Sequence, residues 1–331
     1  MRALKVSGRR QALVQIAAGA AAMVAGPRVF AQSGWPDRTI TIVTPFGAAV
    51  DILARLIAAD IGPRLGANVI VEQRLGGSGT IGMAFVARAP ADGYTLGMGT
   101  TTALTCAPLL MKNPGYDVQK SFTYLGLVQN TRQVLTVSPA LGVNTVQEFI
   151  ALAKSKPGQL NFGSSGVGNS IHLACELFNS ATGIKAVHVP FKTGNETDAA
   201  IIGGQVQYTF AAVSSTLGMI QAGKIKPLAV TGETRDPALP NVITLREAGL
   251  PTRIPEQFYG LVAPAGLPPA ITAKLDKAIA EMQANPAFQE QVRKLGGIPA
   301  QLNGEEFRKV VIADSQTWGG VIKQLNITLS S

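Results

Sequence analysis

Short runs rich in β-branched residues alternate, along the first third of the chain, with segments whose apolar residues recur at helical spacing. The runs 39–44, 68–73 and 94–99 are predicted to be strands, and the segments 52–61 and 81–88 between them are predicted to be helices. Alternation of this kind is typical of parallel strands connected by helices that pack on both faces of the sheet.

A second series of the same type occupies the middle of the chain, and helices dominate its end. Thr145 and Glu148 form a capping-box pattern, which predicts that a helix begins there. The further predicted strands are 122–128, 133–138, 160–162, 186–189, 205–210, 225–231 and 258–263, and the further predicted helices are 170–181, 195–202, 270–284, 286–295 and 304–325. After residue 263 the sequence predicts helices only.

A helical tail that lacks its own sheet has to cover an existing one, and the first sheet is the natural choice. We therefore expect domain 1 to comprise 32–132 and 258–331, and domain 2 to comprise 133–257. Two crossings between the domains would make a hinge with a cleft beside it. The expected architecture is thus α/β with two lobes.

The first 31 residues have the features of a signal peptide. A basic start that includes Arg9 and Arg10 precedes the apolar run 12–24, and this run is shorter than the roughly 20 residues that span a bilayer. We expect cleavage between Ala31 and Gln32 and an exported mature protein. Arg9 and Arg10 resemble a twin-arginine signal but Ala occupies position 12, so both export routes stay open.

Charge and cysteine content narrow the range of partners. The chain has 29 Lys and Arg against 20 Asp and Glu, a net charge of +9. Residues 1–31 supply five of the basic residues and no acidic one, so the remainder carries only +4, scattered along the sequence. This pattern disfavours a nucleic-acid partner. Cys106 and Cys175 are expected to be buried thiols, and His172 and His188 add too few ligands for a metal site, so we predict no metal and no cofactor.

Two stretches share the order strand, loop of small residues, helix. One carries Pro45-Phe46-Gly47-Ala48-Ala49-Val50-Asp51, and the other carries Gly163-Ser164-Ser165-Gly166-Val167-Gly168-Asn169-Ser170. A helix start leaves unpaired N–H groups and a partial positive charge, and small residues let a ligand approach them. The two loops therefore predict a pair of jaws that close on an anion. Asp51 is interpreted as a cap or first-turn acid.

Two enzymatic readings compete with this one. The segment 77–82 matches G-x-G-x-x-G, but 99–102 (Gly-Thr-Thr-Thr) lacks the acidic residue that holds a ribose, so a tight strand-to-helix turn is favoured over a nucleotide site. Ser165 with His172 suggests a serine hydrolase, but Val167 stands where a nucleophile elbow needs glycine. His172 is expected either to pack in its helix or to line the cleft, and His188 is expected to be structural.

Several segments together resemble the Bug family of periplasmic solute-binding proteins, the receptors of tripartite tricarboxylate transporters. The resemblance covers essentially the whole mature chain, and its order and spacing make it specific. It rests on the segments IVTPF (42–46), DILAR (51–55), VEQR (71–74), GGSG (76–79), APADGYTL (89–96), GQLNFGSSG (158–166), HL (172–173), VPFK (189–192) and LVAPAG (261–266).

The resemblance implies a periplasmic-binding-protein-like clamshell (type II), with two mixed sheets flanked by helices and a double-crossover hinge. It implies a periplasmic, monomeric, non-enzymatic protein that binds a small organic carboxylate and transiently contacts membrane transporter subunits. A sensory or scavenging receptor without a transporter is an alternative. Together with the loops described above, it gives the expected ligand-binding residues Phe46, Gly47, Ala48, Ala49, Thr100, Thr101, Ser164, Ser165, Gly166, Gly168, Asn169, His172, Lys192, Thr193 and Ala211.

The chain departs from the family pattern around the expected cleft. Its first loop is poorer in Pro and Gly, the segment 194–197 lacks a common Pro, and Ala211 stands where an Asp is common. Without that acid, the ammonium group of an amino acid would lack a partner. The added methyl groups of Ala48, Ala49, Val50, Ala211 and Ala212 favour a carboxylate with an apolar body, aromatic or aliphatic.

Overall fold

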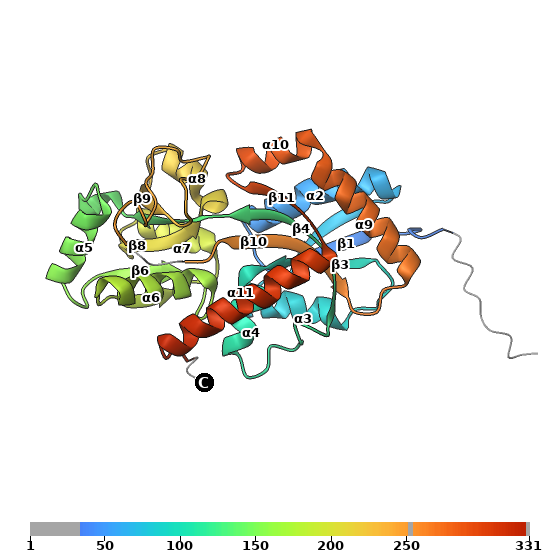
Figure 1. Ribbon diagram of the computed structural model, residues 1–331, viewed down its shortest axis with the longest axis horizontal. Helices are drawn as coiled ribbons and strands as arrows, with labels where there is room; N and C mark the ends of the chain where they lie inside the picture. The colour runs from blue at the N-terminus through green and yellow to red at the C-terminus, as the bar shows by residue number, and fades with distance from the viewer. Residues whose placement is uncertain (1–33, 251–253, 329–331) are drawn as a thin grey trace, which may run out of the picture. The chain divides into compact units, whose positions relative to one another are not determined.

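The strands form two separate mixed sheets in the computed structural model, which describes residues 34–250 and 254–328 (Figure 1). Sheet 1 has the order β11-β4-β10-β3-β1-β2, and sheet 2 has the order β7-β6-β8-β5-β9. Sheet 1 consists of β1 (Ile40–Thr44), β2 (Val69–Gln73), β3 (Thr95–Thr100), β4 (Phe122–Thr131), β10 (Gln257–Pro264) and β11 (Ile298–Asn303). Sheet 2 consists of β5 (Gln133–Val137), β6 (Asn161–Ser164), β7 (Val187–Pro190), β8 (Tyr208–Ala212) and β9 (Lys226–Val230).

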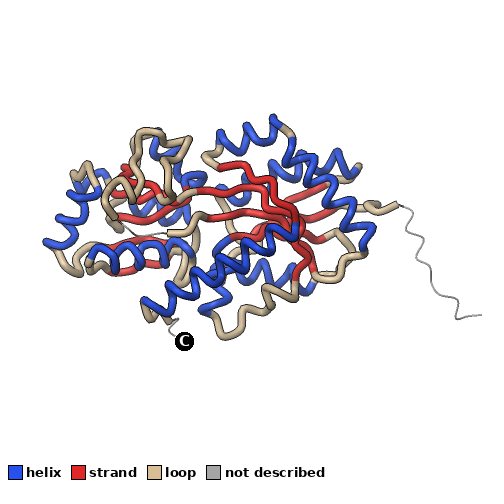
Figure 2. Tube along the Cα trace, in the orientation of Figure 1, coloured by secondary structure: helices blue, strands red, loops and turns tan. Residues whose placement is uncertain are grey.

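Helices cover both faces of each sheet (Figure 2). Around sheet 1 these are α2 (Ala49–Leu65), η2 (Gly77–Gly79), α3 (Thr80–Arg88), the π-helix η3 (Thr102–Cys106), α4 (Ala107–Leu110), α9 (Pro269–Ala284), α10 (Pro286–Lys294) and α11 (Gly304–Gln324). Around sheet 2 these are η4 (Pro139–Leu141), α5 (Val146–Ser155), α6 (Ser170–Thr182), α7 (Gly194–Ile202) and α8 (Val213–Gln221). We call sheet 1 with its helices lobe 1, and sheet 2 with its helices lobe 2.

The chain passes between the sheets twice. It leaves sheet 1 after β4 and enters β5 one residue later, and it returns between β9 and β10. Arg132, the residue between β4 and β5, joins the two crossings because its Nε lies 3.2 Å from Glu256 Oε1. The predicted fold class is confirmed: two mixed sheets are flanked by helices and linked by a double crossover.

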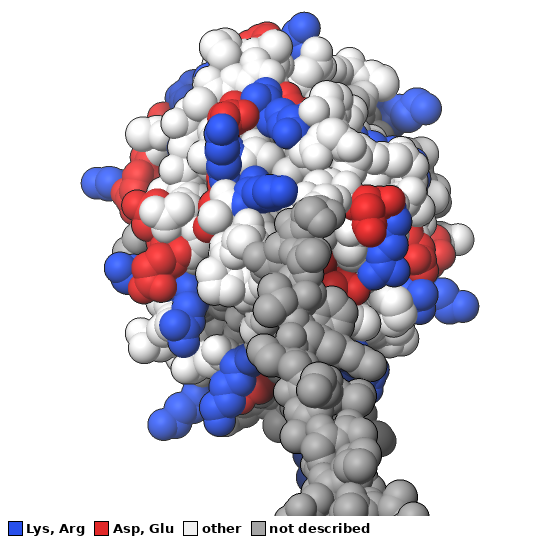
Figure 3. Space-filling view, turned by 90° about the vertical axis from the view of Figure 1, so that its right-hand side faces the viewer, with Lys and Arg blue, Asp and Glu red and all other residues white. Residues whose placement is uncertain are grey.

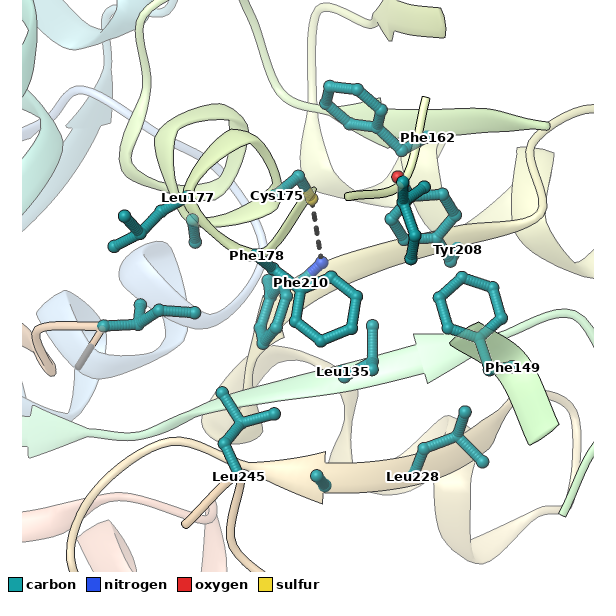
Figure 4. Packing of buried hydrophobic residues seen from close by; sticks show 14 of the residues in the cluster. Leu135, Phe149, Phe162, Cys175, Leu177, Phe178, Tyr208, Phe210, Leu228 and Leu245 are labelled. Carbon is teal, nitrogen blue, oxygen red and sulfur yellow. Dashed lines mark hydrogen bonds between the residues drawn. The ribbon is translucent and has the colours of Figure 1, made fainter. Parts of the chain in front are cut away.

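The hydrophobic core of lobe 2 includes residues from the end of the chain. Phe149, Phe178, Tyr208 and Phe210 pack together between α5, α6 and β8, and the Phe210 amide lies 3.4 Å from Cys175 Sγ (Figure 4). Trp318 of α11 is fully buried in the same cluster, whereas the start of α11 packs against β4 in lobe 1. Because α11 contributes to both cores, the domain boundaries given above stay a prediction.

Strand β11 corrects one expectation. The sequence predicts only helices after residue 263, yet Ile298–Asn303 forms an edge strand antiparallel to β4. Its burial is only partial and Pro299 interrupts its pattern, so the segment lacks the apolar alternation of a half-buried strand. The other predicted elements are present with shifted ends.

Cys106 and Cys175 are both buried and free, as expected. The predicted signal peptide lies outside the described residues. Among the described residues, no helix combines the length and apolar character that a membrane crossing needs. On the face shown in Figure 3, cationic and anionic side chains are interspersed with uncharged surface where the described residues are visible.

Candidate functional site

A cavity of about 970 Å³ lies between the lobes. Eight of the predicted ligand-binding residues line it: Phe46, Gly47, Ala48, Ala49, Ser165, Gly166, Lys192 and Thr193. The other seven do not: Thr100, Thr101, Ser164, Gly168, Asn169, His172 and Ala211. The structure thus places parts of both predicted jaws, and the segment before α7, around one space.

The start of α2 presents unpaired donors to this cavity. Its N-cap is Ala48, which provides no side-chain hydrogen bond, and among the described residues the amides of Ala49, Val50 and Asp51 have no partner. Asp51 in the first turn is partly neutralised by Arg55, whose Nε lies 2.8 Å from its Oδ2. The free amides of Ala49 and Val50 therefore meet the positive end of the helix dipole at residues that line the cavity, as an anion site requires.

Ala48 has an unusual backbone conformation. Its φ is 52° and its ψ is −128°, a combination that glycine adopts easily and alanine does not. Strain of this kind at a non-glycine residue is found where the surrounding structure imposes it, commonly at ligand sites. Here it turns the chain from the loop after β1 directly into α2.

The start of α6 is different, because most of its donors are already used within the protein. Asn169 Oδ1 accepts from the amide of His172 at 2.7 Å, and His172 Nδ1 accepts from the amide of Gly168 at 3.2 Å. The amide of Ser170 donates to Thr102 Oγ1 of lobe 1 at 3.2 Å. This second jaw therefore offers the cavity the loop Ser165–Val167 and little of the helix terminus.

The start of α7 is also capped. Thr193 Oγ1 accepts from the Glu196 amide at 3.2 Å, and Glu196 Oε2 accepts from the Lys192 amide at 3.0 Å. The ammonium group of Lys192 makes no ion pair with any described residue. Because Glu196 is engaged in the cap, Lys192 is the cavity-lining charge that remains for an anion.

The lobes touch each other beside the cavity. Ser78 Oγ donates to the carbonyl of Val167 at 3.0 Å, and the hydroxyls of Thr102 and Ser170 lie 3.0 Å apart. Ser78 belongs to the G-x-G-x-x-G segment, which forms the turn between β2 and α3 as the favoured interpretation predicted. A side chain at Gly79 would lie 2.8 Å from the Phe46 ring, so this glycine allows close packing of the cavity loop.

The predicted residues outside the cavity are occupied elsewhere. Thr100 Oγ1 accepts from the Ala103 amide at 3.2 Å, and Thr101 Oγ1 accepts from the Phe258 amide at 2.8 Å, so both support the start of the π-helix. Ala211 pairs with Val134 inside sheet 2. Sequence analysis missed cavity residues from segments that carry no loop motif: Leu75, Met111, Ile171, Phe191, Ser215, Gln257 and Tyr259.

A serine and a histidine do lie within hydrogen-bonding distance, but not as a hydrolase would place them. His188 Nε2 is 2.7 Å from Ser164 Oγ, and Ser164 is fully buried and also contacts the carbonyl of Gly166 at 3.0 Å. Ser165, the residue considered as a nucleophile, accepts from Asn169 Nδ2 at 2.8 Å. Burial, and then the charge of His172, lowers the pKa of His188 to about 3, which makes it a weak base.

Residues 53–327 match the family model described as "Tripartite tricarboxylate transporter family receptor". The chain belongs to this family. It is 29% identical to Protein BugT of Bordetella pertussis (strain Tohama I) over 298 residues, which are 89% of this chain and 91% of BugT.

Two solved structures of R. palustris proteins extend the comparison for this member of the family. The protein Rpa4515, solved with adipate, has a TM-score of 0.86 at 32% identity, with 89% of this chain and 99% of the other covered. MatC, solved with bound malate, has a TM-score of 0.82 at 30% identity, with 87% of this chain and 100% of the other covered. Members of the family are periplasmic solute-binding proteins with a clamshell fold, as the sequence predicted.

Proposed function

We propose that this protein is a periplasmic receptor that captures a small organic carboxylate and presents it to a tripartite tricarboxylate-type membrane transporter. The observation that carries the proposal is the uncapped start of α2, where the free amides of Ala49 and Val50 belong to residues lining a cavity between two lobes. Export by a signal peptide cleaved after Ala31 is part of this proposal, as are a monomeric state and the absence of catalysis. The adipate and malate bound by related proteins support the ligand class.

The carboxylate would be held mainly by neutral donors. The amides of Ala49 and Val50 and the ammonium group of Lys192 are the groups available to it. Hydrogen bonds from backbone N–H groups to a carboxylate are strong because the acceptor is charged. Among the described residues that line the cavity, Lys192 is the one Lys or Arg. The ligand is therefore not trapped among several cations, and release to a partner stays possible.

The rest of the wall favours an apolar ligand body. Phe46, Leu75, Met111, Phe191 and Tyr259 line the cavity and give a ligand large apolar surfaces to pack against. Polar side chains also line it, among them Gln73, Asn195, Glu196 and Gln257. A pocket with apolar walls and a few convergent polar groups is typical of small-molecule sites. We therefore expect aliphatic or aromatic carboxylates to bind better than amino acids.

A thermal-shift screen of the chain from Gln32 tests the proposal. The panel contains aliphatic mono-, di- and tricarboxylates, aromatic carboxylates, amino acids and NAD(P). A ligand that binds only the folded state stabilises it by about 2.7 kcal/mol at a hundredfold excess over Kd. We expect shifts with carboxylates and none with NAD(P); a shift with NAD(P) alone would favour a nucleotide-dependent enzyme.

Two variants locate the site. Ala49→Glu places a carboxylate at the first position of α2, where it suits the helix dipole but repels an anion and competes for its donors. Ala49→Gln is the uncharged control of nearly the same shape. We expect Ala49→Glu to abolish the carboxylate shift and Ala49→Gln to retain it. Equal binding by both variants would place the anion elsewhere.

A further inference from the structure

Two imidazole rings are stacked beneath the cavity loop Ser165–Val167. His172 lies in the first turn of α6 and His188 lies in β7, and their ring centroids are 3.9 Å apart with an interplanar angle of 21°. Phe162 of β6 stacks with both rings, and its centroid lies 4.9 Å from that of His188 and 6.0 Å from that of His172. His172 is buried and His188 is half-buried, and neither lines the cavity.

Each ring holds one end of the loop. At its far end, His172 Nδ1 accepts a hydrogen bond from the amide of Gly168 at 3.2 Å. At its near end, His188 Nε2 lies 2.7 Å from Ser164 Oγ, which in turn contacts the carbonyl of Gly166 at 3.0 Å. The two histidines therefore fix the residues that flank the part of lobe 2 facing the ligand.

These contacts define the protonation of His172. Because Nδ1 of His172 accepts a hydrogen bond, the proton of the neutral ring is on Nε2. Nε2 lies 3.8 Å from Glu176 Oε1. A second proton on Nδ1 would point at the amide hydrogen of Gly168 and would place a charge against His188. The ring is thus compatible with its contacts only while it is neutral.

Few ionisable groups surround the pair. Glu176 of α6 lies within ion-pair distance of His172, and burial raises the pKa of this carboxyl group. On the side of β6 the neighbours are Phe162 and then Tyr208 of β8. Burial lowers the pKa of His172 to about 4, so the neutral form is expected above that pH.

We propose that His172 and His188 are positioning residues of the ligand site: as a neutral stacked pair they hold the loop Ser165–Val167 in its binding geometry, and protonation of His172 releases it. The expected effect of the histidines on ligand affinity rests on the proposed function. Their effect on the loop does not, because the state of the loop can be measured without a ligand. Neither histidine touches the ligand in this scheme. They determine how well the loop is preorganised when the ligand arrives.

The first experiment uses the ligand-free protein and three versions of position 172. His172→Asn keeps an acceptor close to the place of Nδ1 but does not titrate, whereas His172→Phe keeps a ring for stacking but removes the acceptor. We expect the Gly168 amide to exchange with solvent about tenfold faster in His172→Phe and near the wild-type rate in His172→Asn. In wild type, nitrogen NMR should show His172 protonated on Nε2 alone at pH 7. Equal exchange in all three proteins, or a proton on Nδ1, overturns the proposal.

The second experiment measures affinity for adipate and malate by calorimetry between pH 7 and pH 4. We expect His172→Phe to bind about tenfold more weakly than wild type at pH 7, and His172→Asn to restore most of the loss. As the pH falls towards 4, the affinity of wild type should decrease more steeply than that of His172→Asn. Protonation of the ligand affects both proteins equally, so it does not contribute to this difference. Parallel pH profiles would contradict the proposal.

The two experiments separate the possible failures. If neither dicarboxylate binds wild type, that result counts against the proposed function, while Gly168 exchange still decides the role of the histidines. If His172→Phe does not fold, exchange at Gly168 in wild type between pH 7 and pH 4 decides instead. Because intrinsic amide exchange itself slows as the pH falls, the rate is compared with the intrinsic rate at each pH as a protection factor. A protection factor that decreases no more than in His172→Asn would then refute the inference.

Discussion

Replacing Ala48, the N-cap residue of α2, by glycine should stabilise this protein. Ala48 has a φ of 52° and a ψ of −128°, where an L-residue with a Cβ is strained. Such strain costs about 1–3 kcal/mol. Glycine removes it, but adds about 0.4–1 kcal/mol of conformational freedom to the unfolded chain. The expected net gain in the free energy of unfolding is about 0.5–2 kcal/mol, or a rise in Tm of about 1–3 °C for a chain of this size.

The neighbouring residue provides a matched control. Ala49 is the first residue of α2 and has helical geometry, so Ala49→Gly relieves no strain and should lower stability by up to about 1 kcal/mol. Urea unfolding and calorimetry of both variants measure the difference. If Ala48→Gly destabilises the protein as much as Ala49→Gly does, the strain assigned to Ala48 is absent and the backbone at the anion site is relaxed.

Three further perturbations follow from the packing of the two lobes. Burial raises the pKa of Asp198 to about 6 in the folded protein, so ionisation of this carboxyl group above that pH destabilises the fold. Asp198→Asn should therefore raise the free energy of unfolding at pH 8 by up to about 3 kcal/mol and leave it unchanged at pH 3.5, as measured by chemical denaturation at each pH. Gly260→Ala should destabilise the protein severely because the new Cβ would lie 2.5 Å from Phe307 and 2.6 Å from the Gly126 carbonyl oxygen. Gly218 lies within α8 with open space around it, so Gly218→Ala should stabilise the protein by about 0.5–1 kcal/mol, and Tm measures both changes. Thr102→Val removes both hydrogen bonds to Ser170 and should increase the ligand-free radius of gyration in X-ray scattering; an unchanged radius would mean that these bonds do not hold the lobes together.

The sequence predicts the elements of this fold well where apolar periodicity is strong. The Thr145 cap is present, with its Oγ1 accepting from the Glu148 amide at 3.1 Å, because the signals for a helix start are local. Strand β11 was missed because its identity depends on β4, a partner more than 160 residues earlier. Tertiary pairing of that kind leaves little trace in a partly exposed edge strand.

The candidate site was predictable in position but less so in detail. Loops at the start of α2 and α6 are visible in the sequence, and parts of both line the cavity. The roles of Thr100 and Thr101 were not predictable, since Thr101 accepts from Phe258 of a strand that enters from the far side of the hinge. Tyr259 was missed for the same reason: its place in the cavity depends on β10 pairing with β3.

The two helix starts that appeared alike in the sequence have opposite chemistry, and their caps explain the difference. Ala48 cannot accept a hydrogen bond through its side chain, so the first amides of α2 remain free for an anion. Asn169 is a preferred cap and its side chain accepts from the His172 amide. Thr102 accepts from the Ser170 amide, and the His172 ring accepts from the amide of Gly168 just before the cap. Residue preferences at the cap position thus separate a helix start that can bind a ligand from one that is already satisfied. By this criterion we expect α2 to recognise the charge of the ligand and the loop before α6 to close over it, with α6 itself anchoring that loop.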